Sequence, residues 1–144
     1  MEIIPAKTSG FCFGVNKAVR TIYELLDKGE EKICTLGPII HNEQVVDNLK
    51  KRGVQVCSSV DDIDGCSSVV IRAHGISPEV YDELNCKGIK IVDATCPYVK
   101  KIHKLVKEKF DKGYKIIIIG DKNHPEIIGI NGWCSNSAAI IDKP

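Results

Sequence analysis

The chain has 144 residues, of which 43% are hydrophobic and 27% are charged, and its formal net charge is +1. This length suits one domain, or one and a fraction, and allows a core to be buried without disulfide staples. A net charge near zero gives no electrostatic basis for binding nucleic acid or an anionic membrane. The sequence has no apolar run of membrane-spanning length and no signal peptide, so we expect a cytoplasmic protein.

The first half of the chain alternates short β-branched runs with helical patterns that end at glycine. Apolar residues at helical spacing predict three helices, and proline at a first helical position marks one of the starts. The intervening apolar runs are typical of strands. The predicted strands cover residues 2–7, 32–36, 54–57, 68–73 and 89–94, and the predicted helices cover residues 14–28, 42–53 and 77–88.

The second half continues the same alternation. A helix is predicted from Pro97 to Gly113, followed by a strand over residues 114–119. That strand is almost wholly apolar, which predicts burial on both faces. A strand-to-helix turn follows over residues 120–133, and a last strand over residues 138–141.

Alternating strands and helices predict an α/β fold, a parallel sheet with helices on both faces. The pattern divides near Cys96. We expect one complete three-layer unit over residues 1–96 and part of a second, similar unit over residues 97–144.

The turns after the predicted strands, and the turn before the first helix, carry the residues with useful chemistry. In an open parallel sheet, the loops after the carboxyl ends of the strands gather at one edge, where such folds bind ligands. These residues are Cys12, His41, His74, Cys96, His124 and Glu126. Their shared placement is more informative than any one of them, because a lone histidine after a strand is more often a turn residue or a satisfied hydrogen-bonding group.

The chemistry of this set indicates a reductase. Cys96 is followed by Pro97, so its sulfur is expected beside a helix N-terminus, and Cys12 has a similar setting. Two such thiolates suit a soft metal or an iron–sulfur cluster. Three imidazoles can donate N–H groups to a multiply charged anion, and Glu126 can pass a proton. A phosphorylated substrate is therefore expected.

The remaining cysteines and basic residues are given no catalytic role. The chain has seven cysteines, no CxxC pair and no secretory signal, which argues against a disulfide framework and against a zinc ribbon. Cys34 and Cys57 are expected in the core, and Cys66 and Cys86 are given no role. Cys134 is either a thiol without a role or a residue whose role the sequence does not specify. His103 is interpreted as structural. Four lysines of its helix are interpreted as a solvated face first and an anion patch second; they are Lys100, Lys101, Lys104 and Lys107.

Five segments, in order, resemble the family of 4-hydroxy-3-methylbut-2-enyl diphosphate reductase, the LytB-type iron–sulfur reductases. The segments are SGFCFGVNKAV, LGPIIHNEQVV, IRAHGISPEV, VDATCPYVKKIH and GDKNHPEIIGINGW. The resemblance runs from the first residues to about Asn136. It implies an oxidoreductase of the non-mevalonate isoprenoid pathway that removes the substrate hydroxyl as water, giving isopentenyl and dimethylallyl diphosphate.

The resemblance also implies roles for the residues singled out above. Cys12 and Cys96 match two of three ligands of a [4Fe–4S] cluster, and Glu126 matches the proton donor. The diphosphate-binding histidines are matched by His41, His74 and His124. The electron donor implied is a ferredoxin or flavodoxin-type protein.

The family enzyme is about twice as long as this chain and has three α/β units. Its third cysteine ligand has no counterpart here, so we expect an N-terminal fragment that is inactive alone. The alternative is a non-catalytic α/β module that binds an anion or a metal.

Overall fold

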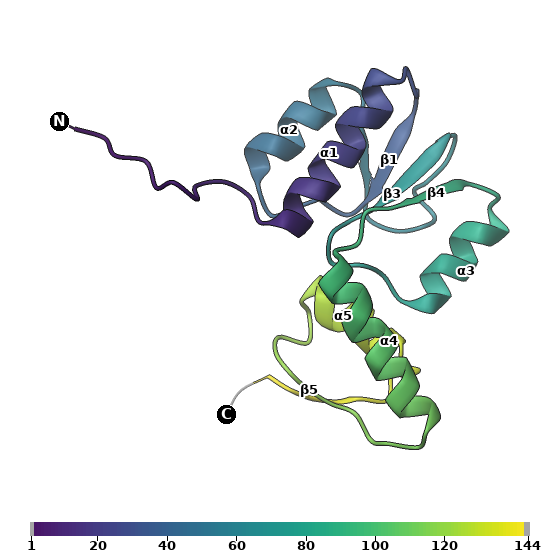
Figure 1. Cartoon of the computed structure of the whole chain (residues 1–144). Helices are drawn as coiled ribbons and strands as arrows, with labels where there is room; N and C mark the ends of the chain where they lie inside the picture. Colours follow the sequence, from purple (N-terminus) through teal and green to yellow (C-terminus); the bar gives the residue numbers. More distant parts are fainter. Residues whose placement is uncertain (1, 143–144) are drawn as a thin grey trace.

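The computed structural model describes residues 2–142, which form two parallel sheets and five helices (Figure 1). The elements in order are α1 (Phe13–Asp27), β1 (Ile33–Leu36), α2 (Glu43–Lys51), β2 (Gln55–Cys57), β3 (Ser68–Ile71), α3 (Pro78–Cys86), β4 (Lys90–Asp93), α4 (Pro97–Asp111), β5 (Ile117–Ile119), α5 (Pro125–Gly132) and β6 (Ala139–Ile141). Among the described residues, no helix is both long and apolar enough to cross a membrane.

The first sheet has the strand order β2-β1-β3-β4, and all its neighbouring strands are parallel. Cys34 of β1 pairs with Val69 of β3, and Val70 of β3 pairs with Val92 of β4. The carboxyl ends of β1, β3 and β4 therefore lie side by side, and the segments that follow them leave the sheet at one edge.

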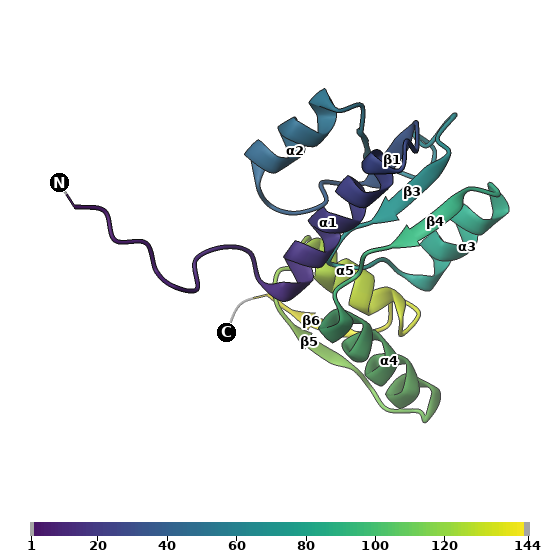
Figure 2. The ribbon, with the colours of Figure 1, turned by 45° about the horizontal axis from the view of Figure 1, so that its top comes forward.

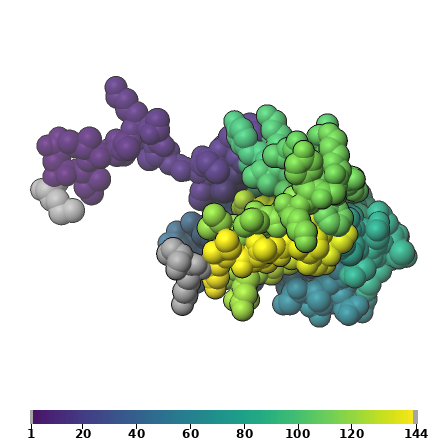
Figure 3. Space-filling model, turned by 90° about the horizontal axis from the view of Figure 1, so that it is seen from below, coloured from purple at the N-terminus to yellow at the C-terminus, as the bar shows by residue number. Residues whose placement is uncertain are grey.

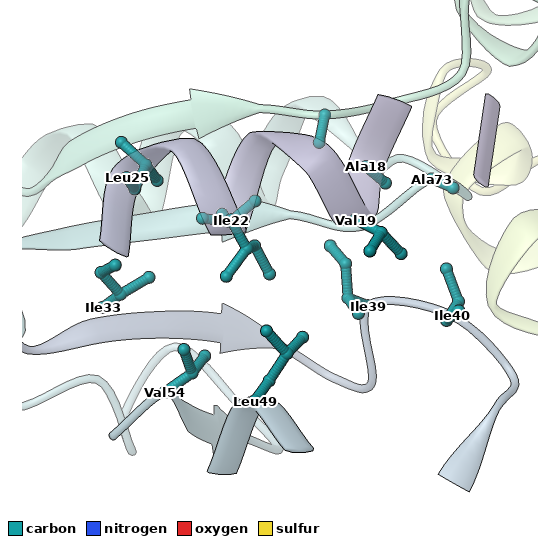
Figure 4. Close-up of a cluster of buried hydrophobic side chains, with 12 residues drawn as sticks. Ala18, Val19, Ile22, Leu25, Ile33, Ile39, Ile40, Leu49, Val54 and Ala73 are labelled. Atoms are coloured by element: carbon teal, nitrogen blue, oxygen red, sulfur yellow. The ribbon is translucent and has the colours of Figure 1, made fainter. Parts of the chain in front are cut away.

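Helices cover both faces of this sheet. Consecutive strand residues point to opposite sides of a sheet, so neighbouring residues of β1 pack against different helices. Ile33 belongs to the cluster that includes Ile22 of α1 and Leu49 of α2, drawn in Figure 4. Cys34, the next residue, belongs to a second cluster that includes Leu84 of α3. The predicted α/β fold with helices on both faces is confirmed.

The second sheet pairs β5 with β6 in parallel, with α4 and α5 beside it (Figure 2). Ile118 is only 8% exposed, whereas Ile117 and Ile119 are 66% and 81% exposed. The prediction that this strand is buried on both faces is wrong. Its side chains alternate between two faces, and the described residues cover only the face of Ile118. The last segment, in yellow, lies along the surface in Figure 3.

The prediction of a first strand over residues 2–7 is also wrong. Residues 2–12 contain no helix or strand, and the segment extends away from the body of the protein (Figures 1 and 2). A strand needs a neighbour for its backbone N–H and C=O groups, and no strand of the first sheet pairs with this segment. Pro5 also removes one backbone donor.

One pair of cysteines differs from the expectation that the chain has no disulfides. Cys34 and Cys66 form a disulfide between residues 32 positions apart. The backbone explains their proximity, because Ser67, next to Cys66, donates its N–H to the carbonyl of Lys32 at 3.1 Å. The prediction against disulfides is therefore wrong for this pair, although Cys34 is buried as expected.

Candidate functional site

Three histidine rings meet at the carboxyl edge of the strands. His41 follows β1, His74 follows β3, and His124 follows β5 of the second sheet. Their ring centroids are 4.8 Å apart for His41 and His74, 5.5 Å for His74 and His124, and 5.7 Å for His41 and His124. We call this group the histidine cluster. The structure thus brings together three residues that the sequence places in separate turns.

Local hydrogen bonds hold two of these turns. His41 precedes Asn42, whose side chain caps α2 by accepting the N–H of Val45 at 3.0 Å. His124 itself caps α5, because its Nδ1 accepts the N–H of Glu126 at 3.2 Å. In neutral His124 the ring proton therefore lies on Nε2, which leaves an N–H donor for a ligand.

The ring of His74 is partly buried and lies beside three other cationic or titratable side chains. Burial, together with His41, Arg72 and His124, lowers the pKa of His74 from 6.5 to about 4. The ring is therefore neutral at pH 7. Its Nδ1 is buried and has no hydrogen-bond partner among the described residues. A buried ring nitrogen without a partner is costly, and a bound ligand would remove that cost.

Arg72 places a positive charge beside His74, and sequence analysis gave it no role. Its guanidinium lies against Gly37, where an added Cβ would come within 2.5 Å of Nη1. Burial lowers the pKa of Arg72 from its ordinary value, although the group stays protonated. The segment IRAHG contains Arg72, but only the fold shows that Gly37 leaves room for it.

The two predicted cysteine ligands lie at helix N-termini. Cys12 precedes α1 and is exposed, Cys96 precedes α4 and is half-buried, and neither side chain caps its helix. The N–H of Cys96 bonds to the carbonyl of Ala73 at 3.0 Å, which places Cys96 beside the segment of His74. Gly14 lies against Cys96, because an added Cβ would come within 2.6 Å of its Sγ. The start of α1 and the start of α4 are therefore in contact.

These thiols are suitable donors for an iron–sulfur cluster. Their side chains form no capping hydrogen bond, helix N-termini favour thiolates, and glycine at position 14 leaves the Sγ of Cys96 uncrowded. Another group of close sulfurs, Cys34, Cys57 and Cys66, lies in the core beneath α3 instead.

Glu126 lies in the first turn of α5, two residues from His124, and is half-buried. Its backbone N–H is committed to His124, but no hydrogen bond engages its carboxylate among the residues that the structure describes. A carboxylate in this position is free to accept or deliver a proton next to the histidine cluster.

The histidine cluster can bind either of two kinds of ligand. Its ring nitrogens include one from each histidine that all lie within 4.8 Å of one another, which is compatible with a shared metal ion. The same three rings, with Arg72 behind His74, can also surround the oxygens of an anion. The geometry thus defines an α/β protein with an imidazole-lined ligand site at the sheet edge.

The family model of the LytB protein matches residues 3–144, and the chain belongs to that family. It is 48% identical to the 4-hydroxy-3-methylbut-2-enyl diphosphate reductase of Thermoanaerobacter sp. (strain X514), over 99% of this chain and 51% of that protein. It is also 48% identical to the reductase of the same name from Clostridioides difficile (strain 630), over 98% of this chain and 50% of that protein. The chain spans about half the length of these relatives.

Two solved structures are similar to this chain. One is the E-1-hydroxy-2-methyl-but-2-enyl-4-diphosphate reductase from Plasmodium falciparum, with a TM-score of 0.89 and 34% identity over 95% of this chain and 43% of that one. The other is an (E)-4-hydroxy-3-methyl-but-2-enyl diphosphate reductase, with a TM-score of 0.79 and 44% identity over 99% of this chain and 51% of that one. The resemblance predicted from five sequence segments is confirmed.

Proposed function

We propose that this chain supplies the diphosphate-binding half of a reductase that converts 4-hydroxy-3-methylbut-2-enyl diphosphate to isopentenyl and dimethylallyl diphosphate. The observation that carries the proposal is the histidine cluster, with its unpartnered Nδ1 on His74 and the guanidinium of Arg72 behind it. His41, His74 and His124 would donate N–H groups to the diphosphate oxygens. The names of the relatives support this choice of substrate.

We also propose that Cys12 and Cys96 hold a [4Fe–4S] cluster, with a third cysteine supplied from outside these 144 residues. When bound, such a cluster would supply electrons one at a time. The contact of Gly14 with Cys96 supports this pairing, because Cys12 lies two residues before Gly14. A ferredoxin or flavodoxin-type electron donor and a cytoplasmic location belong to the same proposal.

Glu126 would hold the proton that the departing hydroxyl needs. It is adjacent in space to His124 through the bond between its N–H and Nδ1. Residues 1–96 would form the first α/β unit, which carries Cys12, His41 and His74. Residues 97–144 would form part of a second unit, which carries His124 and Glu126. The diphosphate would then lie between the two units.

Calorimetric titration with inorganic pyrophosphate tests the binding site. We expect saturable binding by this chain, its loss in His74→Ala, and unchanged binding in Arg20→Ala. Arg20 is a suitable control because it is an exposed basic residue of α1 that forms an ion pair with Glu24. Binding that survives His74→Ala would place the anion elsewhere and refute the assignment.

A metal-binding module is the second candidate, favoured by the neutral ring of His74 and the short distances between the ring nitrogens. Neutral imidazole is the form that binds zinc. Zinc titration of the chelator-treated chain distinguishes the two. Zinc binding that depends on His74, without pyrophosphate binding, would favour the module.

Anaerobic reconstitution tests the cluster assignment. We expect this chain alone to bind less than a stoichiometric four-iron cluster, because two thiolates do not complete the ligand set. Iron counting and the visible absorption spectrum are the measurements. A full cluster on this chain would contradict the expectation, and any iron retained should be lost in Cys96→Ala and unaffected in Cys86→Ala.

A further inference from the structure

His103, on α4, lies against Gly75, the residue after His74, but has no part in the roles proposed above. It is only 4% exposed, and its Nε2 has no hydrogen-bond partner among residues 2–142. Its ring stacks on Trp133, with centroids 5.2 Å apart and an interplanar angle of 21°. A buried imidazole without a polar partner carries a cost that hydrophobic residues of similar size avoid.

Trp133 ties α5 to the segment that carries His74. It lies at the C-cap of α5, the helix that His124 begins. Its Nε1 donates to the carbonyl of Ile76 at 3.0 Å. One indole therefore connects the end of the helix of His124 with the backbone two residues after His74.

The ring of His103 contacts the same segment from α4. A Cβ added to Gly75 would come within 2.5 Å of Cε1 of His103 and within 3.0 Å of Cγ2 of Thr95. The ring therefore occupies the space that a side chain at position 75 would need. Its contact is with the backbone of the residue directly after His74.

Glycines let α5 approach this segment closely. A Cβ added to Gly132 would come within 2.1 Å of Cβ of Ser77, and one added to Gly129 would lie 3.6 Å from the carbonyl oxygen of Gly75. The close approach of α5 depends on the missing side chain at Gly132, whereas a Cβ at Gly129 would make only an ordinary van der Waals contact. The segment of residues 74–77 is thus held between α5 and His103.

We propose that the stacked pair of His103 and Trp133 positions His74 in the histidine cluster. Cys96 is the N-cap of the helix of His103. His124 and Trp133 are the N-cap and the C-cap of α5. The side chains of His103 and Trp133 both contact the backbone that follows His74. The pair therefore joins α4, α5 and the segment that follows His74. It acts on the ligand only through His74, so both are positioning residues. The proposal rests on the function proposed above.

Two variants test it. Trp133→Phe keeps an aromatic ring for stacking but removes the donor to Ile76, and His103→Ala removes the ring beneath Gly75. We expect each to weaken pyrophosphate binding roughly 5- to 10-fold, the effect of misplacing one ligand hydrogen bond. The ring resonances of His74 should shift in the NMR spectrum of each variant. If His103→Ala does not fold, Trp133→Phe still decides the question.

Leu25→Ala is the matched control. Leu25, near the end of α1, is buried beside Ile33, and Figure 4 shows it at the other end of its cluster from Ala73. The substitution should destabilise the chain by at least as much, yet leave the pyrophosphate affinity and the His74 resonances as in the wild type. A merely structural role for His103 and Trp133 predicts the same behaviour as Leu25→Ala, and that result overturns the proposal.

The two proposals fail separately. If the wild-type chain does not bind pyrophosphate, the proposed function fails, but the His74 resonances still report its position. Resonances of His74 that are the same in the wild type, Trp133→Phe and His103→Ala would overturn the positioning proposal alone. So would wild-type pyrophosphate affinity in both variants.

Discussion

Gly75→Ala is expected to destabilise the chain by more than its backbone conformation alone explains. Gly75 has φ +72°, and alanine in this left-handed region costs about 1–2 kcal/mol. The added Cβ also meets Cε1 of His103 at 2.5 Å and Cγ2 of Thr95 at 3.0 Å. Overpacking of this kind adds about 1–3 kcal/mol. The total loss should be about 2–5 kcal/mol.

Gly88→Ala separates the two contributions. Gly88 has φ +67°, close to that of Gly75, but a Cβ added there meets nothing within 4 Å. It should lose only the backbone cost of about 1–2 kcal/mol. Urea unfolding followed by far-ultraviolet circular dichroism gives the free energy of unfolding of each variant.

A double-mutant cycle identifies the contact responsible. In a His103→Ala background, the cost of Gly75→Ala should fall toward that of Gly88→Ala, because the nearest atom has gone. Equal losses for the two glycine variants in the otherwise unchanged chain would refute the reasoning, since the tight contact between Gly75 and His103 would then not exist.

Three further outcomes are expected. Burial lowers the pKa of His103 from 6.5 to about 4, so its contribution to the free energy of unfolding is present above pH 6.5 and is lost as the pH falls toward 4. At pH 4.5 this loss is about 2–3 kcal/mol, and urea unfolding of His103→Gln should show a smaller loss of the free energy of unfolding than the wild type does. Thiol titration of the unfolded, unreduced chain should count five thiols, rising to seven on reduction, with a peptide containing linked Cys34 and Cys66; seven before reduction would contradict the disulfide. Ile22→Ala should cost about 3–4 kcal/mol, and Ile119→Ala, at an 81% exposed position, less than about 0.5 kcal/mol by the same assay; similar costs would contradict the assignment of the core.

The helices and most strands could be predicted because their signals are local. Proline at the start of α4 and glycine after its end bracket an apolar stripe, and the helix forms there. Residues 2–7 have strand-like composition, but a strand also requires a partner, which local sequence does not specify. The exposure of Ile117 and Ile119 escaped prediction for a similar reason, because apolar composition does not reveal whether a second layer covers the strand.

The candidate site could be predicted as a set of turns but not as a geometry. Parallel-strand logic places His41, His74 and His124 at one edge, and the rings do lie within 6 Å of one another. The contact between Trp133 and Ile76 joins residues 57 positions apart, and no sequence pattern marks it. The same is true of Cys34 and Cys66, whose proximity depends on strand order.

The histidine cluster draws its members from two separate sheets, since His41 and His74 follow strands of one and His124 follows a strand of the other. A ligand that needs all three rings therefore binds only molecules in which both sheets are docked. Binding energy then opposes any local opening that detaches α5, and amide hydrogens of α5 should exchange more slowly in the presence of the ligand. Ligand binding would thus stabilise the packing of the two sheets against each other.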